Sequence, residues 1–170
     1  MKRVLLAAGA AFMIGASSTP ALAQLQADDD ATASITVLAP LTVTKDQDLE
    51  LGAVVVSGAG SYQLAGDGTV TDTPGTVDAF ASGPAAEVAT FDITADGSVT
   101  YDVVVSDDVT LTNGNGDTLT LSTDEGGLIV NGGAGLQGNQ TVSVGGRIVF
   151  VGTEPGGDYT GTINLEATYN

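Results

Sequence analysis

The residues of this sequence that could do chemistry are almost all oxygen donors. Asn113, Asn115 and Asp117 lie in one glycine-rich stretch, and clustered amide and carboxylate oxygens are the ligands that Ca²⁺ prefers. Asn-Gly pairs are also strong signals for a tight hairpin turn, because glycine supplies the positive φ that such turns need. Since the stretch occurs once, and calcium-binding repeats depend on repetition, the sequence favours a hairpin turn. Ca²⁺ is the one cofactor it leaves open.

Other acidic residues offer weaker cation sites, namely Asp102 with Asp107 and Asp108, and the pair Asp124 and Glu125. The whole chain is acidic, with 21 Asp and Glu against 4 Lys and Arg and a formal charge of −17. Most of these carboxylates are therefore expected to stay solvated. A chain this acidic is repelled by nucleic acid and by anionic membrane surfaces, so we expect neither as a partner.

The sequence offers few residues of the types that commonly catalyse reactions. The chain has no His and no Cys, which removes imidazole bases, thiolate nucleophiles, disulfides and the metal sites built on either residue. Carboxylate pairs can hydrolyse glycosides, yet none here lies in a recognisable motif. The sequence therefore predicts a protein that is not an enzyme.

The first residues have the features of an export signal. Lys2 and Arg3 precede an uncharged apolar run at 4–16, and Ala21-Leu22-Ala23 follows a short polar stretch. This is the pattern of a secretory signal peptide cleaved after Ala23, and the apolar run is too short to span a bilayer comfortably. We expect residues 1–23 to be removed, residues 24–30 to form a flexible acidic N-terminus, and no membrane span to remain. The protein is then secreted, to the periplasm, the cell surface or the medium.

The remaining residues, 31–170, predict one all-β domain. Short apolar and β-branched runs alternate with Gly- and Asn-rich turn signals. The expected strands are 31–39, 41–43, 49–56, 62–64, 68–71, 87–94, 98–105, 109–112, 117–122, 128–130, 140–144, 147–151 and 159–169. Residues 72–86 are expected to be a long loop. We predict an antiparallel, immunoglobulin-like β-sandwich of roughly eight to ten strands.

The last of these strands has the clearest alternation. One face carries the apolar side chains Tyr159, Ile163, Leu165 and Tyr169, and the other face is polar. Strict alternation of this length indicates one buried and one solvated face.

The first predicted strand, 31–39, has two interpretations. Ala33, Ile35, Val37 and Ala39 share its apolar face, and Pro40 then interrupts the chain. Proline lacks the N–H of a central strand, so the segment is either the chain's own edge strand or a separable unit. A separable strand could insert into a second copy through main-chain bonds and alternate side-chain pockets, with Ile35 and Val37 as the main plugs.

Both ends of residues 31–170 resemble the bacterial secreted family called domain of unknown function 4402. A wider resemblance links the Leu-x-Leu-Gly segment at 49–52 and the Pro-Gly-x-x-Tyr-Thr segment at 155–160 to spore-coat-U-like and chaperone–usher pilin subunits. In those subunits an immunoglobulin-like sandwich lacks one strand, and a neighbour's N-terminal extension fills the gap. The resemblance implies a pilin-like fold and a donor strand at residues 31–39.

Two functions follow as expectations. The first is a non-catalytic surface protein, a pilus-like or coat-like subunit that forms homopolymers by strand exchange. The second is a monomeric secreted or periplasmic β-sandwich that binds an adhesive target or Ca²⁺. The sequence leaves open whether residues 31–39 pair within the chain or with a neighbour.

Overall fold

The computed structural model describes residues 28–123 and 127–170. The chain divides into two units, Met1–Thr36 and Val37–Asn170. In the first unit, the described residues 28–36 are exposed and form no helix or strand. The predicted signal peptide at 1–23 and residues 24–27 of the predicted acidic N-terminus lie outside the described residues.

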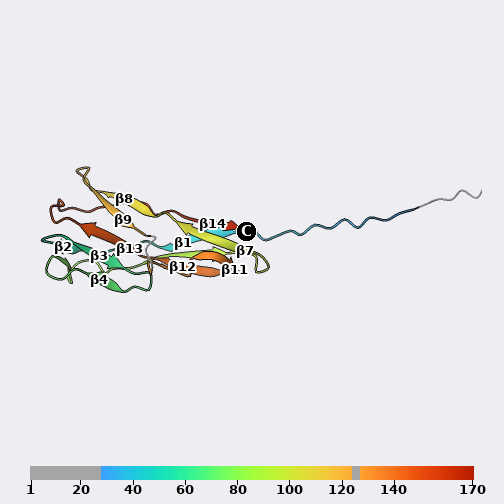
Figure 1. The fold of residues 1–170 in the computed structure, drawn as a ribbon, viewed down its shortest axis with the longest axis horizontal. Helices are drawn as coiled ribbons and strands as arrows, with labels where there is room; N and C mark the ends of the chain where they lie inside the picture. The colour runs from blue at the N-terminus through green and yellow to red at the C-terminus, as the bar shows by residue number, and fades with distance from the viewer. Residues whose placement is uncertain (1–27, 124–126) are drawn as a thin grey trace, which may run out of the picture. The chain divides into compact units, whose positions relative to one another are not determined.

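The second unit is all β, as the sequence predicts. Its described residues form fourteen strands and no helix. The strands are β1 (Thr42–Gln47), β2 (Val54–Val56), β3 (Gly60–Leu64), β4 (Val70–Asp72), β5 (Val77–Ala79), β6 (Ala89–Thr94), β7 (Thr100–Val105), β8 (Asp108–Thr112), β9 (Thr118–Ser122), β10 (Ile129–Val130), β11 (Gly133–Gln137), β12 (Gln140–Val144), β13 (Gly146–Phe150) and β14 (Leu165–Tyr169) (Figure 1).

These strands form four sheets in which every pairing is antiparallel. The sheet orders are β1-β6-β12-β10, β11-β7-β14, β4-β3-β13-β9-β8 and β2-β5. The edge strands β1 and β14 belong to different sheets but lie side by side (Figure 1). Each of these two strands is therefore hydrogen-bonded to a neighbouring strand of its sheet on one side only.

Two groups of buried side chains hold the sheets face to face. In the first, Phe91 and Val142 of the β1-β6-β12-β10 sheet pack with Tyr101 and Val103 of the β11-β7-β14 sheet. In the second, the five-stranded sheet packs around Val77 of β5 and the side chains of β2. Burying each large apolar side chain contributes about 1.5–3 kcal/mol, so both groups of side chains stabilise the fold.

Local sequence explains the best-formed elements. β6 buries every second side chain, as its alternation of apolar and polar residues requires. β13 also buries every second side chain, although Val149 on its exposed face is apolar. The predicted turn at Asp67-Gly68 joins β3 to β4, and Gly68 has the positive φ of 86° that the turn needs. The Asn-Gly-rich stretch joins β8 to β9 in the same way.

The structure also corrects several expectations. It has more strands than the eight to ten expected, because short elements such as β5 and β11 form where little apolar alternation is present. β5 lies inside the predicted loop 72–86, where Val77 is fully buried. The predicted strand 159–169 is a strand only from Leu165 onward, and residues 31–39 form none.

Candidate functional site: an apolar groove

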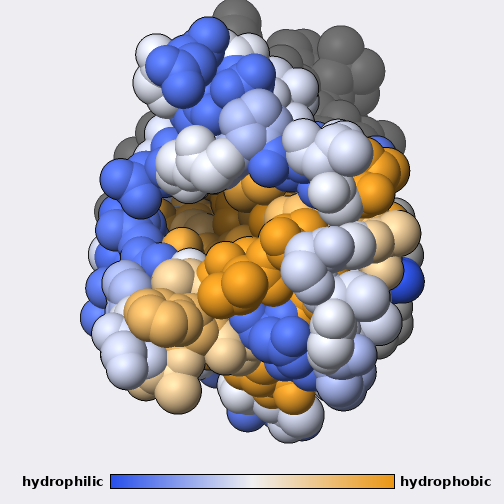
Figure 2. Space-filling view, turned by 90° about the vertical axis from the view of Figure 1, so that its left-hand side faces the viewer, coloured by the Kyte–Doolittle hydropathy of each residue, from blue (hydrophilic) through white to orange (hydrophobic). Residues whose placement is uncertain are grey.

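A groove with a volume of about 990 Å³ opens at one end of the second unit. Viewed from the end where β2 lies, the molecule shows a hollow with apolar side chains on its floor and hydrophilic side chains above and to the left of it (Figure 2). The floor consists of side chains from the second core group, among them Tyr62, Leu111, Leu121, Ile148 and Phe150. Two chain segments, 48–56 and 154–163, form the walls.

The first wall continues the chain beyond β1. Glu50 exchanges two backbone hydrogen bonds with Glu87, at 2.8 and 2.7 Å. Because successive residues of an extended chain direct their N–H and C=O groups to opposite sides, those of Leu49 and Leu51 face away from Glu87. Within residues 28–123 and 127–170, the backbone groups of these two leucines form no hydrogen bond.

The second wall precedes β14 and is also hydrogen-bonded through its backbone on one side only. Thr160 exchanges two backbone hydrogen bonds with Thr112 of β8, at 2.8 and 3.1 Å, and Asn164 accepts one from Ser106 at 2.9 Å. The alternate residues Gly161 and Ile163 therefore direct their backbone groups away from β8. In the part of the chain that the structure describes, these groups are also without a hydrogen-bond partner. The groove is thus flanked by two unpaired backbone edges.

Apolar side chains along the walls are only half-buried. Leu49 and Ile163 pack against both core groups, while Leu51 and Tyr159 pack against the second group alone. Inner strands such as β13, in contrast, bury their apolar face almost completely. β1 is exposed on both faces, and its Val43 remains 38 % exposed. Among residues 28–123 and 127–170, nothing therefore covers this side of the fold.

The rim of the groove is acidic. Asp48, Glu50, Glu154 and Asp158 lie along it, and the one cation there, Lys45, is paired with Asp48 at 2.6 Å among the described residues. Burial raises the pKa of Glu154, but hydrogen bonds from the backbone N–H groups of Val151 and other residues of its turn outweigh burial and bring the pKa below its ordinary value. Glu154 therefore remains a carboxylate near neutral pH.

The four apolar residues predicted for the C-terminal strand have separate roles. Ile163 and Tyr159 line the groove, and the Tyr159 hydroxyl donates to the Pro155 carbonyl at 2.8 Å. Burial, followed by the charges of Asp117 and Glu154, raises the pKa of this tyrosine. Leu165 and Tyr169 instead pack on the first core group in β14.

The residues predicted for the donor segment are accessible. Ile35 is 88 % exposed and Val37 82 % exposed, and Ala33 is exposed as well. Ala39 is held by two hydrogen bonds: its N–H donates to Asp96 at 3.2 Å and its carbonyl accepts from the Tyr169 hydroxyl at 3.0 Å. The segment is thus exposed and unpaired in strands up to a fixed point at Ala39.

The weak calcium candidates form a hairpin turn. Asn113 is 7 % exposed, and its side-chain oxygen accepts the backbone N–H groups of Asn115 and Asp117 at 3.0 and 2.9 Å. Its side-chain amide also donates to the Asp117 carboxylate at 2.9 Å. The oxygen that a cation would need is therefore already engaged in closing the turn.

The other acidic candidates are dispersed. Asp102 accepts hydrogen bonds from Gly135 and Asn170, both at 2.8 Å. Asp124 and Glu125 lie outside the described residues. Across the described ranges, no three Asp or Glu side chains gather as a metal site would require.

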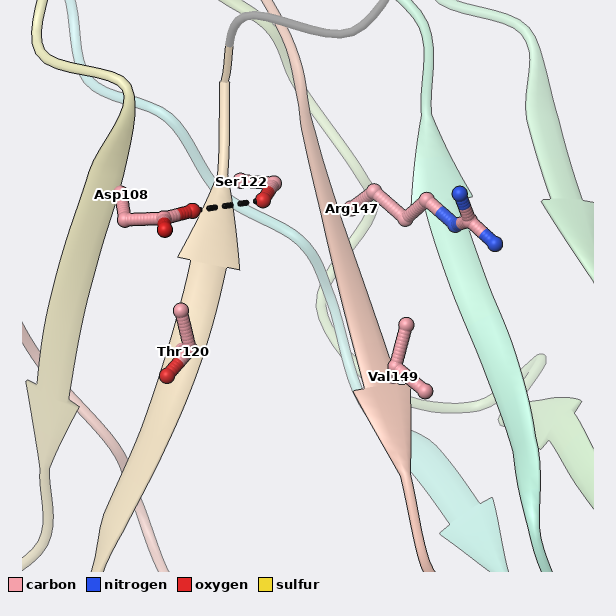
Figure 3. A pocket seen from close by; sticks show the side chains of 5 residues that line it. All are labelled: Asp108, Thr120, Ser122, Arg147 and Val149. Carbon is pink, nitrogen blue, oxygen red and sulfur yellow. Dashed lines mark hydrogen bonds between the residues drawn. The ribbon is translucent and has the colours of Figure 1, made fainter.

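A second, smaller pocket of about 210 Å³ lies on the five-stranded sheet. Asp108, Thr120, Ser122, Arg147 and Val149 line it, and Ser122 donates to Asp108 at 2.7 Å (Figure 3). In Figure 3 the Arg147 guanidinium extends over β3, away from that pair. The pocket is open and shallow, and its lining residues do not converge on one point.

Sequence reasoning identified the groove only in part. It singled out Tyr159, Ile163 and the segment 49–52, but it assigned no role to Gly161 or to the backbone groups of Leu49 and Leu51. The signal was present in the Leu-x-Leu-Gly segment at 49–52, which alternates like a strand.

Residues 41–169 match the family model described as "Domain of unknown function (DUF4402)". No curated protein and no solved structure matches the chain. The described residues include no helix that is long and apolar enough to cross a membrane.

Proposed function

This chain belongs to the family described as domain of unknown function 4402, whose description assigns no activity, and we therefore propose its function from the groove. The chain is a non-catalytic, secreted structural protein. Copies join by strand exchange: residues 31–39 of one copy occupy the groove of a second. The inserted strand completes an immunoglobulin-like sandwich in a pilus-like or coat-like homopolymer. The observation that carries the proposal is the pair of unpaired backbone edges flanking an apolar floor.

The two edges suit an extended peptide. Leu49 and Leu51 offer free N–H and C=O groups at a two-residue spacing, and Gly161 and Ile163 offer the same on the opposite wall. A strand between them bonds to one wall through its odd residues and to the other through its even residues. Strand addition of this kind derives affinity from main-chain bonds and specificity from alternate side-chain pockets.

The segment at 31–39 has the matching side-chain pattern. Ala33, Ile35 and Val37 lie on one face, while Thr32, Ser34 and Thr36 lie on the other. The apolar face suits the groove floor, and the polar face suits solvent. Since Ile35 and Val37 are almost fully exposed, burying them contributes about 1.5–3 kcal/mol each.

Charge opposes association. The chain carries a formal charge of −17, and the donor segment follows Asp28, Asp29 and Asp30. An acidic donor approaching an acidic rim is repelled at low ionic strength, and the repulsion is largely screened above about 0.1 M salt. Assembly is therefore expected to accelerate as salt is added.

Size-exclusion chromatography with light scattering tests the proposal. The chain 24–170 is expected to form oligomers, and the variant Ile35→Asp is expected to remain monomeric because a carboxylate cannot enter the apolar floor. Val149→Asp is the matched control, since Val149 is 63 % exposed on β13 and lies outside the groove.

A chain that begins at residue 41 gives the complementary measurement. It should be monomeric and should bind an added peptide of sequence 31–39. Stable monomers of the full chain that tolerate Ile35→Asp and ignore the peptide would contradict strand exchange. They would favour the second candidate, a monomeric module whose 990 Å³ groove binds another extended ligand.

A further inference from the structure

The chain contains Asn-Gly pairs at 113–114, 115–116 and 131–132. The side-chain carboxamide of an asparagine can be attacked by the backbone nitrogen of the next residue, which closes a five-membered succinimide ring. A following glycine leaves that nitrogen unhindered, because glycine has no Cβ. The three pairs are therefore candidate sites of self-modification, and their hydrogen bonds distinguish them.

The two pairs in the turn between β8 and β9 are held by hydrogen bonds. The Asn113 carboxamide accepts the N–H groups of Asn115 and Asp117 and also donates to Asp117, so it is fixed in the turn. The attacking nitrogen of the second pair, that of Gly116, donates to the Asn113 carbonyl at 3.1 Å. This nitrogen must lose its proton before it attacks, and the hydrogen bond stabilises the protonated form. The turn therefore opposes the reaction at both of its asparagines.

Asn131 lies where the ladder between β10 and β12 ends. Val130 pairs with Ser143, and the same register continued by two residues would pair Gly132 with Thr141. Within the described residues, however, the Gly132 N–H forms no hydrogen bond, and the Thr141 carbonyl accepts the Asn131 side-chain amide at 3.1 Å. The Asn131 carboxamide thus takes the acceptor that a continued ladder would give to Gly132. The attacking nitrogen carries no hydrogen bond, and the carboxamide lies on the side to which its N–H would point.

Two further features favour the reaction at Asn131. Among the described residues it is the one residue other than glycine with a positive φ, 61°. This strained conformation lowers the cost of the rotation that ring closure requires. Gly132 cannot be replaced by a larger residue without a clash, because an added Cβ would lie 2.4 Å from Cγ2 of Ile129. The packing of β10 therefore requires glycine next to this asparagine.

We propose that Asn131 and Gly132 form a self-modification site, at which the asparagine becomes aspartate or isoaspartate. The Gly132 nitrogen bonds to Cγ of Asn131, the bond from Cγ to Nδ2 breaks, and ammonia leaves with the proton of the Gly132 N–H. Water then opens the ring at Cγ, which gives aspartate, or at the backbone carbonyl, which gives isoaspartate. Water is consumed, ammonia is released, and nothing is oxidised or reduced. The site is independent of strand exchange.

The product changes a link between two sheets. Residues 131 and 132 connect β10 of the β1-β6-β12-β10 sheet to β11 of the β11-β7-β14 sheet, and Ile129 and Leu136 on either side pack on the first core group. A carboxylate at position 131 has no N–H to donate to the Thr141 carbonyl. Isoaspartate also adds one carbon to the main chain at this point. The modified chain should therefore melt at a lower temperature than the unmodified chain.

Peptide mapping by mass spectrometry tests the site. The chain 24–170 is incubated under mildly acidic and mildly alkaline conditions, both folded and in denaturant, and isoaspartate is identified by enzymatic methylation. Asn131→Gln is the matched control, because it keeps the side-chain amide but would have to close a larger, six-membered ring. Asn131→Asp gives the melting temperature of one product directly.

The folded wild type should lose its side-chain amide at Asn131 first, and faster at alkaline pH. The two asparagines of the turn should react about tenfold more slowly, the factor that one ordinary hydrogen bond represents. In denaturant the three pairs should react at similar rates. The melting temperature of the wild type should fall during incubation towards that of Asn131→Asp, while that of Asn131→Gln stays constant.

Two results would overturn the proposal, and neither requires a variant to fold. One is that Asn131 of the folded chain stays intact over the time in which the denatured chain converts. The other is that Asn113 or Asn115 converts before Asn131 in the folded chain.

Discussion

Replacing Ile35 by Ala separates assembly from folding. Ile35 is 88 % exposed within a single chain, so its truncation should change the free energy of unfolding by less than about 0.5 kcal/mol. In the strand-exchanged form that we propose, the same side chain would be buried on the groove floor. The substitution should therefore weaken association while leaving the subunit as stable as before.

The size of the effect follows from the buried surface. Changing Ile to Ala removes about three carbon groups, at about 0.8 kcal/mol each, so insertion loses about 2.4 kcal/mol. This corresponds to a dissociation constant about 60-fold larger. Val37→Ala removes about two groups and should weaken binding about 15-fold by the same reasoning.

A peptide-binding assay measures these values directly. The acceptor is the full chain with Ile35→Asp, whose groove is expected to be empty, and the ligands are peptides 31–39 with Ile or Ala at position 35. Fluorescence anisotropy gives the two dissociation constants, and thermal melting of the full-length Ile35→Ala variant reports folding. Equal affinities of the two peptides, or a clear loss of subunit stability, would refute a buried plug at this position.

Three further predictions concern the subunit itself. Asn113→Ala should destabilise it by about 1–3 kcal/mol in denaturant titrations, because the backbone N–H groups of Asn115 and Asp117 both lose their acceptor. Added Ca²⁺ or chelator should leave the transition unchanged. Asp102 has a pKa below the ordinary 3.8, because the side-chain amide of the C-terminal residue and then a backbone N–H of β11 donate to it. The stability that Asp102 contributes can be measured as the difference in melting temperature between the wild type and Asp102→Asn. This difference should be complete above about pH 3.8 and should vanish as the pH falls through the lowered pKa. A difference that grows on acidification would contradict this. Gly145→Ala should destabilise the subunit strongly, since the added Cβ would lie 2.0 Å from the Leu64 carbonyl oxygen. The control Gly114→Ala should be nearly neutral, because no atom lies within 4 Å of its added Cβ. Equal melting temperatures of the two variants would refute the close packing of Gly145 against Leu64.

The well-ordered strands could be predicted because their residues satisfy two requirements at once. β6 alternates apolar and polar residues and also has a paired neighbour on both sides. The hairpins at Asp67-Gly68 and at Asn113 were visible because their turn chemistry is local. Where the apolar alternation agrees with the strand pairing, the sequence is sufficient to predict the strand.

The remaining elements depend on partners far away in the sequence. β11 contains a Gly-Ala-Gly run with no apolar alternation, and it is a strand because it bonds to β7. Residues 159–163 have strong alternation but little pairing, since they border the groove. The groove walls could not be predicted because an unpaired backbone group leaves no mark in the sequence, whereas the apolar alternation of Ile35 and Val37 does.

Backbone hydrogen exchange tests strand exchange most directly. The amides of Leu49, Leu51, Gly161 and Ile163 should exchange quickly in the monomeric Ile35→Asp chain and become protected when peptide 31–39 is added. The amide of Thr160, already bonded to Thr112, serves as the internal reference and should change little. Protection of all four amides is the result that an inserted strand requires, and rapid exchange at the four while the peptide is bound would contradict it.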